Sequence, residues 1–585
     1  MITELRLRNY KGFESAEISI RPLTFLVGKN SSGKTSFLQF LLALHQSHRH
    51  TRRRNPSIFE HNGPLVKFGP AQNLWRSKDT SLPLEFSVKF DDSAFKHSMF
   101  QARAAFAAWL RDHGLELADQ ILNYRNNADS ESADARTADE ALKNTEIEAK
   151  IREAIDVIDE FEDYEINFLS SMHRCAQSIF QLQEFAPDDF FVPNRKSEKF
   201  KHRGPIGFGS LRRPQISKLA ESDIACCIEL IDNLTNIQVR KGIFLNYELE
   251  ANEQYDVYAK SIDVLTSNNR LLLGINIDNP SKEGNSIFTN IRSDFVSRNI
   301  GSFASGLNSN YIKGYLNGFL DIFSQGPDLI FESEDIPRTA ALAAYIIERA
   351  QDLAFDGCMR HQVSHVPPLR AHPRRYYYED LSSSVDDEAL FTRLENSSIK
   401  KSINEWLSEF GIKIDIASLE QVIRKIIVSP NINSDLELEI SDVGFGFSQV
   451  LPVIVAIISA RPGSLVLVEQ PEVHLHPDMQ ASIGNLFTRL VDKVIDGDEP
   501  IRFIVETHSE YLLTEVRAQI AKGKISSDQV SILHFTSDET GKNIVARADI
   551  SETGMISWPS NFIDRHYRNQ ADIINSQFEV SEPKD

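Results

Sequence analysis

The chain has 585 residues, too many for one hydrophobic core, so we expect two or more domains or a domain with a large insertion. Its net charge of −20 argues against a surface that is basic all round and restricts any nucleic-acid contact to local patches. Arg6, Arg8 and Lys11 interrupt the N-terminal segment, so it lacks a signal-peptide pattern, and no apolar run is long enough to span a membrane, so we expect a cytoplasmic protein with no membrane contact.

The N-terminal region predicts a small antiparallel lobe followed by a glycine-rich loop. Leu5 and Leu7 alternate with charged residues, which is typical of a half-buried strand, and residues 9–13 turn toward a second strand. An apolar strand at residues 23–27 then leads into Gly28-Lys-Asn-Ser-Ser-Gly-Lys-Thr35 and an apolar helix.

This loop has the composition and spacing that bind a nucleoside triphosphate. Its glycines let backbone N–H groups wrap phosphate oxygens, Lys34 reaches the β- and γ-phosphates, Thr35 offers its hydroxyl to Mg²⁺, and the helix N-terminus adds its positive end. Glycine-rich turns are common, but an apolar strand before the loop and an apolar helix after it favour nucleotide binding. The residues expected to hold the nucleotide are Gly28, Asn30, Ser32, Gly33, Lys34, Thr35 and Ser36.

The middle of the chain changes its hydrophobic period. After a strand at residues 84–90, the pattern is helical and more polar from about residue 93 to residue 234. Strand-like segments return between residues 239 and 277, so the helical stretch is expected to be an insertion within a sheet-rich lobe. A second helical region is expected at about residues 310–354.

Three motifs follow one another in the C-terminal part. A strand ends at Asp442-Val-Gly-Phe-Gly-Phe-Ser-Gln449, and the apolar strand at residues 464–468 ends at Glu469-Gln-Pro-Glu472. Another apolar strand at residues 501–505 leads into Glu506-Thr-His-Ser509. Ligands in open α/β sheets bind beyond the carboxyl ends of the strands, so these motifs are expected to converge on the phosphate loop.

These motifs in this order resemble the ABC-type ATPase heads of the RecF, SMC and OLD families, and in particular the OLD-like group that includes the Septu PtuA ATPases. The likeness is carried by V-G-F-G-x-S-Q-V-L-P at residues 443–452, E-Q-P-E-V-H-L-H-P at residues 469–477 and E-T-H-S-E at residues 506–510. It covers about residues 1–90 and 363–564. It implies an α/β fold, an ABC-type ATPase head with a P-loop parallel sheet, an antiparallel β lobe and a mostly helical insertion, and it implies ATP and Mg²⁺ as cofactors.

The hydrophobic patterns and the resemblance together divide the chain into five expected segments. They are the N-terminal part of the head with the P-loop (1–92), a helical insertion (93–235), a β-rich lobe of the head (236–280), a helical region (281–355), and the C-terminal part of the head with the signature, Walker B and switch histidine (356–585).

Family roles carry over position by position. Lys34 and Thr35 would hold the phosphates and Mg²⁺, Glu469 would support the Mg²⁺ shell, and His508 would be the switch histidine that senses the γ-phosphate. Gln72 is a candidate for the glutamine linked to Mg²⁺, but an ordinary surface glutamine explains it equally well.

Two further groups bear on how such heads pair. In relatives the signature loop reaches the ATP of a second subunit, so Gly446 and Ser448 would act in trans, and the ATP-bound form would be a homodimer or a higher oligomer. Arg370, Arg374 and Arg375 lie in a P-L-R…P-R-Y segment that also occurs in the resembling group. They serve the head or its dimer contact, or they pair with surface carboxylates.

One position departs from the family pattern. Gln470 follows the Mg²⁺ carboxylate, where these ATPases usually carry the glutamate that polarises the attacking water. A glutamine can position water but cannot accept its proton at neutral pH. Either Glu472 takes part in hydrolysis, or ATP is held for long periods and the protein works as a slow timer or sensor. We favour slow turnover.

The resemblance implies a prokaryotic antiphage-defence ATPase that oligomerises and controls a separate partner nuclease by its nucleotide state. The segment after His508 carries no recognisable acidic triad and no H-N-H pattern, so the chain is not expected to cut nucleic acid itself. The expected partner is an HNH-type nuclease, and a retron reverse transcriptase with its DNA is a further candidate.

Two alternatives remain at this point. One is a DNA-repair ATPase like RecF or SMC, and the other is a nucleotide-held scaffold that hydrolyses slowly. Basic clusters at residues 48–54 and 195–213 are candidates for local nucleic-acid contact or are solvated loops.

Overall fold

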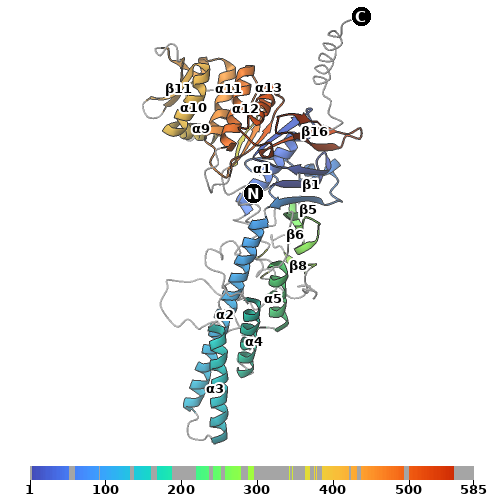
Figure 1. Ribbon diagram of the computed structural model, residues 1–585, viewed down its shortest axis with the longest axis vertical. Coiled ribbons are helices and arrows are strands. Elements are labelled where there is room, and N and C mark those ends of the chain that lie inside the picture. Colours follow the sequence, from blue (N-terminus) through green and yellow to red (C-terminus); the bar gives the residue numbers. More distant parts are fainter. Residues whose placement is uncertain are drawn as a thin grey trace.

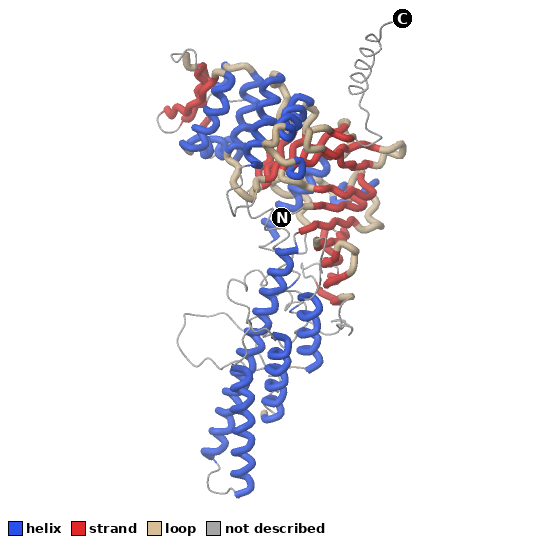
Figure 2. Tube along the Cα trace, viewed as in Figure 1, coloured by secondary structure: helices blue, strands red, loops and turns tan. Residues whose placement is uncertain are grey.

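The structure is a computed structural model. It describes residues 3–51, 59–90, 92–131, 138–159, 168–186, 219, 221–235, 242–251, 257–278, 287–294, 342, 346, 363–368, 370, 375, 377–378, 385–419, 423–430, 436–492 and 500–558. These residues form two seven-stranded sheets, a smaller four-stranded sheet and the helices that flank them (Figure 1). The strands gather in one part of the molecule, and a group of helices extends away from them (Figure 2).

One seven-stranded sheet is antiparallel throughout, in the order β2-β1-β4-β5-β6-β7-β8. Alternation along β1 buries Leu5 and Leu7, as the sequence predicts. The strands are β1 (Glu4–Tyr10), β2 (Phe13–Ser19), β4 (Leu84–Phe90), β5 (Ile243–Ala251), β6 (Val257–Thr266), β7 (Leu271–Asp278) and β8 (Ile287–Arg292).

The last of these strands corrects one prediction. The sequence predicts a helical region at residues 281–355, but Ile287–Arg292 form β8, which pairs with β7. The β-branched residues Ile287, Thr289 and Ile291 alternate in this segment, which favours a strand. Apart from residues 342 and 346, the predicted helix at about residues 310–354 lies outside the described residues.

The other seven-stranded sheet brings the motifs to one edge. Its order is β18-β17-β16-β3-β15-β14-β9, and β16, β3, β15, β14 and β9 run parallel to one another. Their carboxyl ends therefore lie along the same edge of the sheet. The strands are β3 (Leu23–Gly28), β9 (Val363–Val366), β14 (Leu465–Glu469), β15 (Arg502–Glu506), β16 (Val530–Ser537), β17 (Asn543–Ile550) and β18 (Ile556–Ser557).

Helices and a small sheet complete the head. The small sheet contains β10 (Tyr377–Tyr378), β11 (Ile412–Leu419), β12 (Ile423–Pro430) and β13 (Leu438–Glu439). The helices of the head are α1 (Lys34–Thr51), α9 (Val385–Glu395), α10 (Ser397–Leu407), α11 (Phe445–Ile458), α12 (Pro477–Asp492) and α13 (Glu510–Ala521). Short 3₁₀ turns are η1 (Ala71–Leu74), η2 (Arg76–Lys78), η3 (Ser408–Phe410), η4 (Ile440–Asp442) and η5 (Ser527–Gln529).

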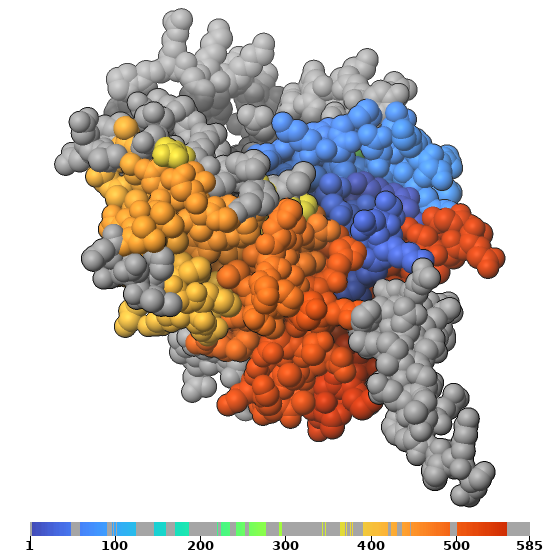
Figure 3. Space-filling view, turned by 90° about the horizontal axis from the view of Figure 1, so that it is seen from above, coloured from blue at the N-terminus to red at the C-terminus, as the bar shows by residue number. Residues whose placement is uncertain are grey.

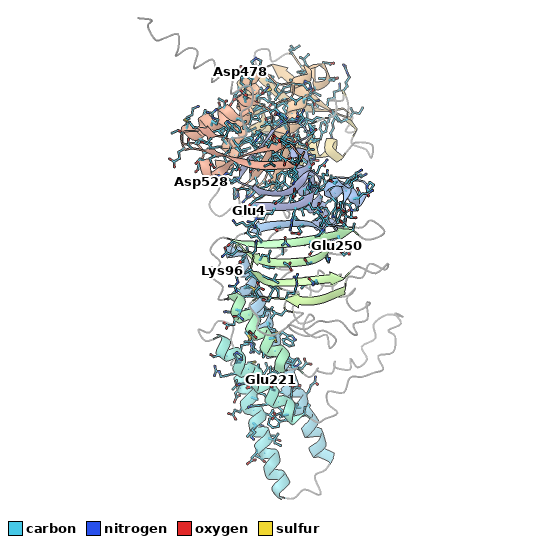
Figure 4. The ribbon with its side chains drawn as sticks, turned by 90° about the vertical axis from the view of Figure 1, so that its right-hand side faces the viewer. Glu4, Lys96, Glu221, Glu250, Asp478 and Asp528 are labelled. Carbon is cyan, nitrogen blue, oxygen red and sulfur yellow. The ribbon has the colours of Figure 1, made fainter. Side chains whose placement is uncertain are left out.

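The helical insertion lies between β4 and β5, where the sequence predicts it. It contains α2 (Asp92–Glu131), α3 (Ala138–Asp159), α4 (Phe168–Phe185) and α5 (Glu221–Thr235). Figure 4 shows the antiparallel strands, marked by Glu4 and Glu250, between the head and the helix that begins at Glu221. The predicted fold class is confirmed: a P-loop parallel sheet, an antiparallel β lobe and a mostly helical insertion.

The parallel sheet separates two hydrophobic cores. Along β14, Leu465 and Leu467 enter the core shared with α1 and the β lobe, whereas Val466 and Val468 enter the core shared with α11, α12 and α13. Both faces are thus buried, and ligands have access only at the strand ends. Among the described helices, none combines the length and apolar character needed to cross a membrane.

Candidate ATP site

The phosphate loop, residues 28–35, has a backbone that only its glycines can adopt. Gly28 has φ 133° and Gly33 has φ 103°, in the region that side chains disfavour. A Cβ atom at Gly28 would also collide with the Phe535 carbonyl, and one at Gly33 would collide with the Phe13 ring. The loop therefore packs between β16 and the start of β2, with no space for a side chain at either glycine.

Lys34 is folded onto its own loop. Its Nζ donates hydrogen bonds to the carbonyls of Gly28 and Lys29, both at 2.9 Å, and lies 3.7 Å from Glu506 Oε1. The side chain is 3% exposed, and burial lowers its pKa against the opposing effect of the Glu506 charge. A buried ammonium at the start of a helix is placed to meet a phosphate.

Glu506 is a functional candidate that the sequence reasoning missed. Strand β15 lies between β3 and β14, so its last residue is next to the phosphate loop, and Thr35 Oγ1 donates a hydrogen bond to Glu506 Oε2 at 3.2 Å. Burial raises the pKa of Glu506, Lys34 opposes the rise, and Glu469 adds to it. A hydroxyl beside a carboxylate offers the hard oxygen atoms that Mg²⁺ prefers, so Thr35 and Glu506 fit the ion of a bound nucleotide.

Glu469, which the sequence assigns to the Mg²⁺ shell, has a different partner. It pairs in register with Glu506 across β14 and β15, but its Oε1 lies 2.7 Å from His365 Nε2 at the end of β9. His365 was also missed, because it precedes Glu469 by 104 residues and belongs to no motif. The two carboxylates share the edge of the sheet, and their separate roles remain predictions.

Gln470 has a strained backbone. Its φ is 45°, a conformation that non-glycine residues adopt rarely and mostly at functional sites. Its N–H donates to the Glu506 carbonyl at 2.7 Å, and its own carbonyl accepts a hydrogen bond from Arg370 at 3.1 Å. Bonds on both sides thus hold this residue at the end of β14.

Glu472 braces the segment that carries the predicted switch histidine. Its Oε2 accepts a hydrogen bond from Thr507 Oγ1 at 2.8 Å, and its Oε1 accepts one from the His508 N–H at 2.7 Å. Burial raises the pKa of Glu472, and these hydrogen bonds oppose the rise. Burial, with the nearby charge of Lys34, lowers the pKa of His508, so its ring is neutral at pH 7.

Gly446 and Ser448, the two residues predicted for the signature loop, lie against other parts of this chain. A Cβ at Gly446 would collide with the His474 carbonyl, and Ser448 is only 4% exposed, so both face the interior of this chain. Gly444, which is exposed and precedes α11, has nothing within 4 Å of a Cβ placed on it. Gly444 is thus the more open of the two glycines, and the role of Gly446 and Ser448 in trans stays a prediction.

A cavity of about 530 Å³ adjoins α1. Gln39, which lines it, lies three residues after Ser36 and so on the same helix face. Tyr10 Oη donates to the Ser36 carbonyl at 2.9 Å, and Lys11 Nζ donates to Gln39 Oε1 at 2.8 Å. The lining includes three lysines and no carboxylate: Lys11, Gln39, Lys67, Phe68, Asn73, Trp75, Ser77 and Lys78.

One predicted metal contact, Gln72, has no further support. Gln72 lies on η1, next to the segment that lines this cavity, but is not itself part of the lining. Within the described part of the chain, no group of three or more His, Cys, Asp and Glu residues could hold a metal ion. The Mg²⁺ expected here therefore needs the oxygen atoms of a nucleotide to complete its shell.

Comparisons with known proteins match ATPase family models to two separate parts of the chain. Residues 1–185 match the family model "AAA ATPase domain", and residues 362–514 match "AAA domain, putative AbiEii toxin, Type IV TA system". The DNA replication and repair proteins RecF of Bacillus thuringiensis (strain Al Hakam) and of Bacillus cereus (strain B4264) are each 28% identical over 90 residues. That match covers 15% of this chain and 23% of each relative.

A solved structure of an SMC head bound to the C-winged helix domain of ScpA aligns over 94% of this chain and 98% of its own, at 9% identity and a TM-score of 0.31. Segments far apart in the sequence form this site: in the space-filling view, the N-terminal surface borders directly on that of the C-terminal third (Figure 3).

Proposed function

We propose that this chain, which matches AAA ATPase models at both ends, binds ATP with Mg²⁺, hydrolyses it slowly, and uses its nucleotide state to control a partner nuclease in antiphage defence. The observation that carries the ATPase assignment is the contact between Thr35 and Glu506, which are 471 residues apart. It joins the phosphate loop to the edge that carries Glu469 and His508.

Each residue has a distinct role in this proposal. Lys34 exchanges its loop carbonyls for phosphate oxygens, and Thr35 with Glu506 holds the Mg²⁺. When bound, the ion neutralises charge on the β- and γ-phosphates. The neutral His508 ring would donate one hydrogen bond to the γ-phosphate, and Gln470 would orient the attacking water through its amide.

Slow hydrolysis follows from how poorly Gln470 and Glu472 can accept a proton from the attacking water. The Gln470 amide cannot take its proton, and both oxygens of Glu472 already accept hydrogen bonds from the segment that carries His508. We therefore assign Glu472 to positioning. Steady-state ATP turnover of the purified protein tests this assignment, and a rate on the order of ten per second would contradict it.

The cavity beside α1 is the proposed place for the base and ribose. A nucleotide whose phosphates occupy the loop would pass Ser36 and reach Gln39 and Lys11 on the same face of the helix. The volume of the cavity, about 530 Å³, lies in the range of small-ligand sites. Burial lowers the pKa of Lys11 to about 8, so its charge is available at neutral pH and is lost under alkaline conditions.

Oligomerisation through the heads is part of the same proposal. Exposed Gly444 and the N-terminus of α11, which carries no side-chain cap, would meet the γ-phosphate held by a second copy through the positive end of the helix. The mass of the protein in solution, with and without ATP, tests this. An ATP-independent monomer would exclude the proposed pairing.

The control of a separate nuclease is the last part of the proposed function. It is supported by the resemblance to Septu PtuA-type ATPases, and the family model over residues 362–514 names a toxin of a toxin–antitoxin system. The test is to express the chain with its neighbouring genes and measure DNA cleavage by the purified complex with and without ATP. Cleavage by the isolated chain would overturn the assignment of cutting to a partner.

A RecF-like role in DNA repair is the second candidate, because the matched RecF proteins are named for replication and repair. Only about a quarter of their length is matched. This role predicts ATP-dependent binding to gapped duplex DNA, which a fluorescence anisotropy titration would detect, and it predicts no dependence on a neighbouring nuclease gene.

A further inference from the structure

Arg370 lies where three segments of the head meet. It follows β9, and its guanidinium donates hydrogen bonds to main-chain carbonyls rather than to side chains. Nη2 donates to Glu469 O at 2.9 Å and to Gln470 O at 3.1 Å, and Nη1 donates to Gln449 O at 3.3 Å. Burial lowers its pKa to about 10, so it remains charged at neutral pH.

One end of this contact holds the strained Gln470. A residue at φ 45° relaxes to a more extended or helical backbone unless its neighbours fix it. The Gln470 N–H is fixed by the Glu506 carbonyl and its C=O by Arg370. The Val473 N–H also donates to this carbonyl, at 3.3 Å, so removing the guanidinium leaves the peptide after Gln470 with one long hydrogen bond and the amide side chain less firmly directed.

The other end holds the first turns of α11, the helix that begins at the exposed Gly444. Gln449 lies on this helix and is 4% exposed. A second contact reinforces the link, because Gly446 is packed against the His474 carbonyl in the same loop as Gln470. A displacement at the N-terminus of α11 is thus transmitted to residues 469–475.

The contact is not fully satisfied as it stands. Within the described residues, Arg370 Nε and Gln449 Nε2 are both buried and have no hydrogen-bond partner. Buried donors are nearly always paired, so two orphans at one junction indicate an arrangement that a small shift of α11 can improve. The guanidinium fork has a spare donor for such a shift.

We infer that Arg370 is a positioning residue that couples α11 to Gln470, so that a second subunit bound at the N-terminus of α11 sets the rate of hydrolysis in this subunit. The inference rests on the proposed pairing of heads. Arg370 acts through the carbonyls of residues 449, 469 and 470.

The test measures ATP turnover per protomer as protein concentration rises through the range in which ATP induces the dimer. For the wild type, we expect turnover to rise about tenfold on dimerisation, a coupling of usual size for allosteric sites. Arg370→Ala should bind a fluorescent ATP analogue within twofold of wild type, dimerise by mass, and show no rise. Arg370→Lys keeps the charge but not the fork, and should recover only part of the rise.

Arg375→Ala is the matched control. Arg375 is in the same segment but is 53% exposed and pairs with the carboxylates of Asp442 and Glu439. Arg375→Ala should keep the full rise in turnover.

A uniform fall in turnover of Arg370→Ala with the rise intact would overturn the inference, as would loss of the rise in Arg375→Ala. Absence of any ATP-dependent dimer in the wild type would instead refute the proposed function. If Arg370→Ala is unfolded by circular dichroism, Arg370→Lys alone decides, and a full rise in it overturns the inference.

Discussion

The two halves of the candidate site are built in different ways. The phosphate-binding half is one continuous loop, residues 28–35, closed by hydrogen bonds of its own Lys34 and supported by one neighbouring carboxylate. The hydrolysis half is assembled from the ends of β9, β14 and β15 and from α11, with Arg370 between them. In the proposed function, nucleotide binding is therefore a local property, whereas hydrolysis depends on packing between segments. The rate of hydrolysis can then be changed without changing the affinity for nucleotide.

The largest expected effect tests whether binding is local. Lys34→Ala removes an ammonium that would make two charge-assisted hydrogen bonds to phosphate, each contributing about 2 kcal/mol. We expect ATP affinity to fall roughly a thousandfold in isothermal titration. Lys400→Ala, which removes a surface lysine paired with Asp415, is the control and should bind as wild type. A loss of less than tenfold in Lys34→Ala would place the phosphates elsewhere.

The second prediction changes hydrolysis without changing binding. Gln470→Glu supplies a proton acceptor where the wild type has an amide, and general-base catalysis typically contributes about a hundredfold or more. The Arg370 guanidinium at the same peptide would keep the new carboxylate ionised. We expect single-turnover hydrolysis to accelerate about a hundredfold with an unchanged dissociation constant.

Glu472 provides the contrasting variant. Glu472→Ala should lower hydrolysis by displacing His508, because Glu472 accepts the His508 N–H. If instead the wild type turns over briskly and Glu472→Ala abolishes turnover while Gln470→Glu has no effect, Glu472 is the base. The distinction between a local binding half and a slow hydrolysis half would then fail.

The boundary between the two halves lies at the two carboxylates of the sheet edge. Glu506→Gln should raise the Mn²⁺ concentration that half-saturates the nucleotide complex about tenfold, since Glu506 contacts Thr35. Electron paramagnetic resonance of free Mn²⁺ measures this without relying on turnover. Glu469→Gln, whose carboxylate contacts His365, should change it less. The reverse order would return the metal role to Glu469.

The difference between the halves also explains what could be predicted from the sequence. The phosphate loop is contiguous, so its spacing singles out Lys34 and Thr35 as candidates, which lie at the start of α1, and the alternation of Leu5 and Leu7 predicts the first strand. Glu506 and His365 were missed because their roles depend on strand order, which places β15 next to β3 and β9 next to β14. No local pattern in a single sequence encodes that order.

The signature loop shows the same limit at finer scale. The glycines at positions 444 and 446 look alike in the sequence, and only the packing of Gly446 against the His474 carbonyl distinguishes them. The segment Ile287–Arg292 was predicted as helix although its alternating β-branched residues favour a strand, and its pairing with β7 fixes it as one. The basic cluster at residues 195–213 lies outside the described residues, so its predicted nucleic-acid contact stays a prediction.

The smallest expected effect concerns the cavity that extends the binding half. Lys11 has a pKa lowered to about 8 by burial, so it is mostly charged at pH 7 and mostly neutral at pH 9. An attraction to the nucleotide is thus present below pH 8 and lost above it. We expect ATP affinity to weaken about threefold between these pH values, the size of a partly exposed charge interaction. Lys11→Met should bind at pH 7 as weakly as the wild type does at pH 9 and show little further change. Lys67→Met, in the same lining, should keep the pH dependence because Lys11 is retained. Equal pH dependence of ATP affinity in the wild type and in Lys11→Met would show that the nucleoside does not bind in this cavity. The binding half would then consist of the phosphate loop alone.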